Sequence, residues 1–160
     1  MIRKLRREYI IPNTIKSLGI SRYESQTTKD KRFLSTMLFE GKVRYFVKAL
    51  LPEVEDTIIL GYTAKQLEWC ENNEKEIWAH FIEKNRIFEN EPSRFMRYFN
   101  DGPFTSADGV PPESAPSMGV WTGWMIIRKY MEEQPDVTLE QLMGERDFDK
   151  ILKLSKYRPG

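Results

Sequence analysis

The stretch that most constrains the fold runs from Thr28 to Leu51 and is followed by Pro52. Its apolar residues recur at spacings of three and four, which places them on one face of an α-helix. These residues are Phe33, Leu34, Met37, Leu38, Tyr45, Phe46, Ala49 and Leu50. The proline ends the helix, because it disfavours helical backbone in the residue before it. The pattern therefore predicts a mainly α fold with a long central helix.

Glycines interrupt the apolar faces of two expected helices. Gly41 stands where the apolar stripe of the long helix would continue, and Gly119 and Gly123 lie four apart in "MGVWTGWMIIRKYM". A Gly-x-x-x-Gly spacing is typical of membrane helix dimers, but this segment contains Arg128 and is too short to span a bilayer. We therefore expect the two helices to pack closely at the centre of the domain, with these glycines permitting the approach.

The segments on either side of the long helix carry weaker signals. The segment "YIIPNTIKSLGI" favours a short helix, with Pro12 in its first turn and Gly19 at its end. The following "SRYESQTTKD" is polar and is expected to be a loop. After the long helix, "LPEVEDTIILGYT" predicts an extended connector.

Capping signals define the helices of the second half. Thr63 with Gln66 forms a capping box, and Asn73 with Glu76 repeats the pattern ten residues later, so residues 64–85 are expected to form one broken helix or two abutting ones. Their expected buried set is Leu67, Trp69, Ile77, Trp78, Phe81 and Ile82. Further short helices are expected after Pro92, after Thr138 with Gln141, and over "DFDKILKLSKY".

Residues 100–117, "NDGPFTSADGVPPESAPS", contain two glycines and four prolines, which predicts an ordered loop or a lid. No strand is predicted. The length of 160 residues is that of one domain, so residues 1–160 are expected to form a single helical domain.

Composition and charge exclude several classes of protein. The 25 basic residues nearly balance the 24 acidic ones, so no nucleic-acid partner is expected. Cys70 is the only cysteine, which excludes an intrachain disulfide and a thiolate metal cluster. No apolar run approaches the roughly 18 residues of a transmembrane segment, and "EYIIPNTIKSLG" is too short and too polar for a signal-peptide core. The chain thus shows no transmembrane segment and no targeting signal.

No complete catalytic or metal site is visible in the sequence. His80 is the only histidine, and it lies in the apolar helix "EIWAHFIEK", where a packed residue is more usual than a metal ligand. Catalytic zinc needs about three protein ligands, which this chain alone does not supply. We therefore predict no catalytic residues, no metal and no cofactor, which makes an enzyme the less favoured interpretation.

A few residues are nevertheless candidates for lining a cleft. The carboxylates Glu40, Asp101, Asp108 and Glu113 have the chemistry of a glycosidase acid–base pair, but the sequence does not fix the distance between two of them, which is the diagnostic feature. Trp121, Trp124 and Tyr130 have the chemistry of a sugar-stacking platform, although aromatic residues at helical spacing are usually core. The candidate cleft-lining residues are Glu40, Asp101, Glu113, Trp121, Trp124 and Arg128.

Several strings occur in one order along the chain: "MLFEGKVRYFVKALLP", "GYTAKQLEWCENNEKEIWAHFIEKN", "GPF", "GVWTGWMIIRKYM" and "SKYRPG". Together they resemble the C-terminal half of the gliding-motility lipoprotein GldB family of Bacteroidota, and the resemblance covers nearly the whole chain. Family members begin with a lipoprotein signal and a lipidated cysteine. Because Met1 would fall well inside a typical member, the chain is expected to be a fragment, a mis-called start or a shortened paralogue.

The family is in turn distantly similar to predicted zinc peptidases of the gluzincin type. In those proteins a His-Glu-x-x-His helix precedes a second helix whose glutamate, followed by glycine, is the third zinc ligand. Glu40 and Gly41 match that second helix, but "YIIPNTIKSLG" offers Pro12 and Lys16 in place of histidines. The resemblance therefore implies a degenerate zincin-like fold, in which Glu40 is a relic or lines a former cleft. An arginine that family members carry before the Gly-rich helix is replaced here by Ser117.

The resemblance implies a non-enzymatic accessory of the gliding-motility or secretion machinery, placed in the cell envelope (periplasmic or lipid-anchored) and acting through protein partners. Two alternatives stay open: a zinc-dependent hydrolase whose histidine ligands are missing from this chain, and a glycan-binding module. A fragment would also leave apolar surface uncovered, so a homodimer is expected in that case. Glu40 is expected to be partly buried near the 100–117 loop and to accept a hydrogen bond from a tyrosine, an arginine or a backbone amide.

Overall fold

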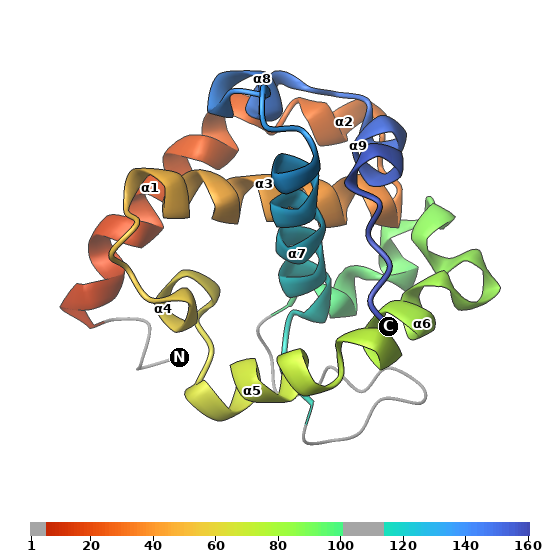
Figure 1. The fold of residues 1–160 in the computed structure, drawn as a ribbon, viewed down its shortest axis with the longest axis horizontal. Helices are drawn as coiled ribbons and strands as arrows, with labels where there is room; N and C mark the ends of the chain where they lie inside the picture. The colour runs from red at the N-terminus through yellow and green to blue at the C-terminus, as the bar shows by residue number, and fades with distance from the viewer. Residues whose placement is uncertain (1–5, 101–113) are drawn as a thin grey trace.

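The computed structural model describes residues 6–100 and 114–160, and the regular elements in these ranges are all helices, which confirms the mainly α prediction. The long helix α3 (Phe33–Leu50) crosses α7 (Met118–Glu133), and these two helices share the most extensive contact (Figure 1). The other α-helices are α1 (Ile10–Tyr23), α2 (Gln26–Lys29), α4 (Asp56–Leu60), α5 (Ala64–Asn72), α6 (Glu74–Ile82), α8 (Leu139–Gly144) and α9 (Phe148–Ser155). Short 3-10 helices are η2 (Arg7–Tyr9), η3 (Glu83–Phe88), η4 (Pro92–Arg94) and η5 (Met96–Tyr98).

The crossing of α3 and α7 depends on two facing glycines. A Cβ atom added to Gly41 would lie 2.2 Å from the carbonyl carbon of Gly123, and one added to Gly123 would lie 1.9 Å from the carbonyl oxygen of Met37. Both distances are too short for real atoms, so the backbones touch only because side chains are missing. The close approach predicted at these two glycines is confirmed. Gly119 serves a different contact, because its added Cβ would lie 2.6 Å from the ring of Phe99.

An aromatic cluster fills the core at the start of α3. Phe33 is fully buried, and its ring centroid lies 5.1–5.5 Å from those of four other rings. These rings belong to Phe81, Phe95, Tyr98 and Phe99. Edge-on and tilted ring contacts of this kind stabilise beyond the area they bury. The cluster therefore ties α3 to α6 and to the short helices that follow it.

The predicted start of the long helix at Thr28 is wrong, because α3 begins at Phe33. The Asp30 carboxylate accepts a hydrogen bond from the backbone N–H of Arg32 and another, at 2.8 Å, from its guanidinium. These bonds hold the intervening backbone extended, which separates α3 from α2. The polar segment 21–30 is consequently not the predicted loop, since it contains the end of α1 and all of α2.

Gly19 was expected to end the first helix, but α1 continues past it to Tyr23. The glycine is buried, and a Cβ atom there would lie 3.3 Å from the ring of Phe46 on α3. Gly19 thus permits α1 to pack against α3, and helix termination is not its role. Pro12 lies in the first turn of α1, as predicted.

The predicted extended connector after α3 contains the short helix α4, which ends at Gly61 in the left-handed conformation typical of a helix C-cap. Two of the three capping boxes are confirmed, those beginning at Thr63 and Thr138. The third is wrong: the Asn73 side chain donates to the carbonyl of Trp69 at the end of α5 and does not cap α6. Helices α5 and α6 abut, as predicted, although Ile82 of their expected buried set is exposed.

Candidate functional site

Glu40 lies on α3 beside the helix crossing, with 24% of its side chain exposed. Its carboxylate accepts a hydrogen bond from the guanidinium of Arg44, one turn further along the helix. This confirms that the carboxylate is partly buried and held by an arginine. Glu40 was also expected to lie near the 100–117 loop. Residues 101–113 of that loop lie outside the described residues.

Arg128 lies on α7 and joins it to α4. Its guanidinium donates to the Asp56 carboxylate at 2.8 Å and lies 3.9 Å from the centroid of the Trp124 ring. Lys48 of α3 pairs with the same carboxylate at 3.2 Å, so Asp56 connects three helices. Burial opposes ionisation of Asp56, but the hydrogen bond and charge of Arg128, aided by Lys48, outweigh it and lower the pKa of the carboxyl. Arg128 is therefore engaged in a link between helices.

Trp121 and Trp124 are core residues, with 1% and 0% of their surface exposed. A sugar-stacking platform needs an exposed ring face, and protein atoms cover both indoles. The idea that these two residues line an open cleft or bind a glycan is therefore wrong. Their helical spacing placed them on the face of α7 that is packed into the core.

The four candidate cleft-lining residues in the described ranges do not assemble into one site. Glu40 and Arg128 bind different partners, the two tryptophans are buried, and Asp101 and Glu113 lie outside the described residues. Within the described ranges no group of three or more His, Cys, Asp or Glu side chains is placed to hold a metal ion.

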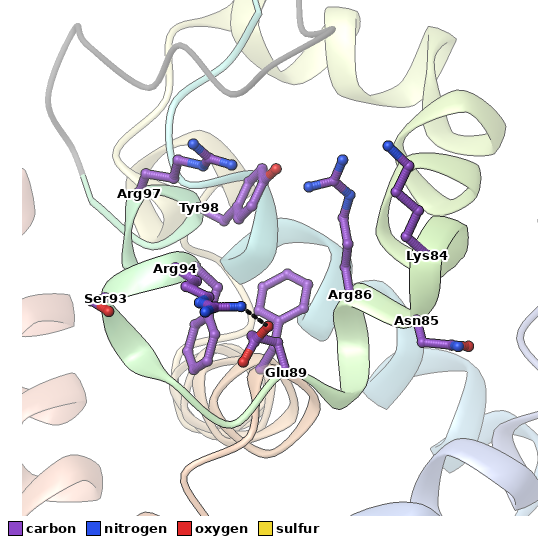
Figure 2. Close-up of a pocket in the computed structure, with 10 residues that line it drawn as sticks. Lys84, Asn85, Arg86, Glu89, Ser93, Arg94, Arg97 and Tyr98 are labelled. Atoms are coloured by element: carbon purple, nitrogen blue, oxygen red, sulfur yellow. Dashed lines mark ion pairs between the residues drawn. The ribbon is translucent and has the colours of Figure 1, made fainter.

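A pocket of about 420 Å³ opens instead among η3, η4 and η5 (Figure 2). Among the described residues, its wall is rich in cationic side chains and contains one carboxylate, that of Glu89. The cationic residues are Lys84, Arg86, Arg94 and Arg97. Figure 2 shows Arg86 and Arg97 extending on either side of Tyr98. We call this feature the basic pocket.

Within the described ranges, acids neutralise one of the four cations in the basic pocket. Arg94 pairs with Glu91 at 2.9 Å and with Glu89 at 3.5 Å. Lys84, Arg86 and Arg97 form no ion pair with any residue in the described ranges, and the buried Nε atoms of both arginines have no acceptor there. Buried N–H groups normally find a partner, so the described part of the pocket carries unsatisfied donors and excess positive charge.

A hydrogen bond between His80 and Tyr98 lies against the basic pocket, with 2.8 Å between His80 Nε2 and the phenol oxygen. Burial lowers the pKa of His80, and the charges of Arg86 and Arg97 lower it further, against the opposing effect of Glu83. The single histidine of the chain is therefore held in its neutral form beside two guanidinium groups. His80 is half-buried, which agrees with the packed or half-exposed residue expected from its helix.

The basic pocket was not predicted, although the sequence held a signal for it. The segment "EKNRIFENEPSRFMRY" alternates basic residues with aromatic ones. Its interspersed acids conceal the charge excess, because only the fold shows which acids face the pocket.

Lys42 is a further feature that was not predicted from the sequence. It lies in the middle of α3 with 0% of its surface exposed, and its Nζ donates to Gln26 Oε1 at 2.8 Å and to the Glu145 carbonyl at 2.5 Å. Burial lowers the pKa of the ammonium group to about 7. Its bonds hold α2 and the end of α8 against α3, which makes it a structural lysine.

Comparison with known proteins identifies the family of the chain. A search of curated proteins and a search of solved structures each returned no significant match. The sequence profile of one family, described as gliding motility protein GldB, matches residues 1–159, nearly the full length. The chain therefore belongs to the gliding motility protein GldB family.

Proposed function

We propose that this chain is a non-enzymatic accessory of the gliding-motility or secretion machinery of the cell envelope and that it acts through contacts with protein partners. The observation that carries the proposal is the family match over residues 1–159. The family label denotes a lipoprotein, which supports a place in the envelope. In the described part of the chain, no helix has the length and apolar character required to cross a membrane.

The contacts of the candidate residues support a role without catalysis. Glu40, the residue that a related peptidase would use as a ligand, is engaged by Arg44. Arg128 is engaged by Asp56 and Trp124. Side chains that are already paired in this way stabilise the fold, and using them to bind a substrate would first require breaking those pairs.

We further propose that residues 1–160 are one helical domain, the C-terminal part of a GldB-like protein with a degenerate zincin-like arrangement. The contacts of α3 support a single domain, because this helix packs against α1 and α2 from the first part of the chain and against α7, α8 and α9 from the last. A unit whose central helix is covered by both ends of the chain has no obvious internal boundary.

The proposal is tested by deleting the gene in its native host and measuring colony spreading and the proteins secreted into the medium. We expect the deletion to impair at least one of these readouts and the wild-type gene to restore it. A Glu40→Gln allele should restore it equally, because an accessory protein does not need this carboxylate for chemistry.

Two results would contradict the proposal. A deletion that leaves both spreading and secretion unchanged would remove the link to this machinery. A Glu40→Gln protein that accumulates normally but fails to restore function would instead indicate catalysis or metal binding at Glu40. Immunoblotting for the variant distinguishes that result from loss of the protein.

A further inference from the structure

We propose that the basic pocket binds a phosphate-bearing ligand, with Arg86 and Arg97 as the principal contacts and Lys84 at the rim. This inference is drawn from the pocket alone and does not depend on the family or on the proposed function. The group that the pocket recognises is a phosphate, which belongs either to a soluble phosphate ester or to a lipid headgroup.

The first argument is the charge of the pocket. Arg94 is balanced by Glu89 and Glu91, whereas Lys84, Arg86 and Arg97 have no ion-pair partner among the described residues. Grouping three cations around one cavity is unfavourable unless an anion joins them. A ligand with two or more negative charges balances this excess better than a single carboxylate does.

The second argument is the unsatisfied hydrogen-bond donors. The Nε atoms of Arg86 and Arg97 are both buried and lack an acceptor in the described part of the chain. A guanidinium presents its Nε–H beside a terminal N–H, a geometry that matches two oxygens of a phosphate group. The two arginines reach the pocket from different short helices, on either side of Tyr98 (Figure 2), so each can offer donors to an anion in the pocket.

The third argument is the backbone that carries these side chains. Lys84 and Asn85 are consecutive residues with positive φ, of 55° and 57°. This left-handed conformation is unfavourable for a residue with a side chain, and such strain concentrates at binding sites. The strained turn reverses the chain after α6 and directs Arg86 back toward the pocket.

The size of the pocket indicates what is attached to the phosphate. A volume of about 420 Å³ lies within the usual range for small-molecule sites and exceeds what a bare phosphate ion fills. Phe33, Phe95 and Tyr98 also line the pocket, but all three are buried and offer a ligand little apolar surface. The ligand is therefore expected to be larger than inorganic phosphate.

Binding is tested on the purified full chain in two arms. Isothermal titration with inorganic phosphate and with pyrophosphate measures soluble ligands. Co-sedimentation with vesicles of phosphatidylglycerol in phosphatidylcholine, against phosphatidylcholine alone, measures a lipid headgroup. We expect saturable binding in at least one arm, and the arm with the tighter binding identifies the source of the phosphate.

Variants then assign the binding to the pocket. Arg86→Gln and Arg97→Gln should each weaken it about tenfold or more, as expected when one charge-assisted contact is lost. Lys84→Asn should also weaken it, and this exposed position keeps a residue type that tolerates positive φ, so the fold is not at risk. Arg22→Gln is the matched control, because this arginine is exposed on α1, a helix that does not line the pocket.

The proposal is overturned if the wild-type chain shows no saturable binding in either arm. It is equally overturned if Arg22→Gln weakens binding as much as the pocket variants do, since that would indicate attraction to the net charge of the protein. Full binding by Lys84→Asn, Arg86→Gln and Arg97→Gln, each folded by circular dichroism, would overturn it as well.

Discussion

Lys42 shows how much one enclosed side chain contributes to this fold. Its ammonium group lies 5.1 Å from the centroid of the Phe148 ring and donates to oxygens on two other segments of the chain. Moving such a group out of water is costly, and these oxygens and the Phe148 ring offset part of that cost. The burial of Lys42 therefore depends on α2, α8 and α9 being in place together.

We predict that Lys42→Met lowers the free energy of unfolding by about 1–3 kcal/mol, because buried oxygens lose their donor. In the folded protein the pKa of Lys42 is about 7, below the ordinary lysine value of 10.5. Between these two pH values the unfolded state therefore binds more protons than the folded state. Wild-type stability should therefore gain more than that of the variant as the pH rises from 7 toward 10. Urea denaturation of both proteins at several pH values measures this difference, and identical pH dependence would contradict it.

Glu40→Gln addresses the metal question. Because Arg44 engages the Glu40 carboxylate, we expect purified protein to hold no stoichiometric zinc. The substitution should change stability by only about 1 kcal/mol, the scale of one hydrogen bond. Elemental analysis of both proteins decides the point. About one zinc per chain in the wild type, lost in the variant, would favour the hydrolase alternative.

Among the helices, the pairing of α3 with α7 determines how the others are placed. The two backbones meet at Gly41 and Gly123, so the helices lie closer than side chains would ordinarily allow. Helix α9 packs on α7, and α1 packs on α3. A change in the distance between the two central helices would therefore shift the outer ones too.

We predict that Gly123→Ala lowers the free energy of unfolding by about 1–3 kcal/mol, the usual cost of overpacking. The added methyl group would lie 1.9 Å from the Met37 carbonyl oxygen, and a backbone atom cannot turn aside as a side chain can. Thermal melting gives the measurement. Gly144→Ala is the control, because nothing lies within 4 Å of that position, and it should melt at or above the wild-type temperature. A Gly123→Ala protein that melts like the wild type would show that the helices do not meet as described.

For the molecule as a whole, the outer face of α1 matters most for association. Ile10, Ile11 and Leu18 are each 58–61% exposed on this one helix. Exposed apolar side chains on one element favour contact with another surface, and a second copy of the chain is one such surface.

We therefore predict a concentration-dependent homodimer in size-exclusion chromatography with light scattering. The double variant Ile11→Lys, Leu18→Lys should shift it to a monomer. Ile82→Lys, at an exposed apolar position on α6, is the control and should leave the dimer intact. A wild-type chain that stays monomeric at every concentration would contradict this prediction.

The sequence by itself determined the features that depend on neighbouring residues. Spacings of three and four established the helices, and the capping boxes at Thr63 and Thr138 fixed two of their starts. Gly41 and Gly123 indicated the central crossing, because a glycine within the apolar face of a helix usually allows another helix to pack closely there. These signals suffice because helix formation and capping act within one or two turns.

Only the tertiary structure decided the features that depend on distant residues. Helix α3 starts at Phe33 partly because Arg32, besides binding Asp30, pairs at 2.7 Å with Asp149 on α9. The basic pocket becomes visible only in the folded chain, where Glu89 and Glu91 both pair with Arg94 and leave the other pocket cations without an ion-pair partner among the described residues. Burial and charge compensation are properties of the packed chain, and local periodicity carries no information about which distant side chain will supply a partner.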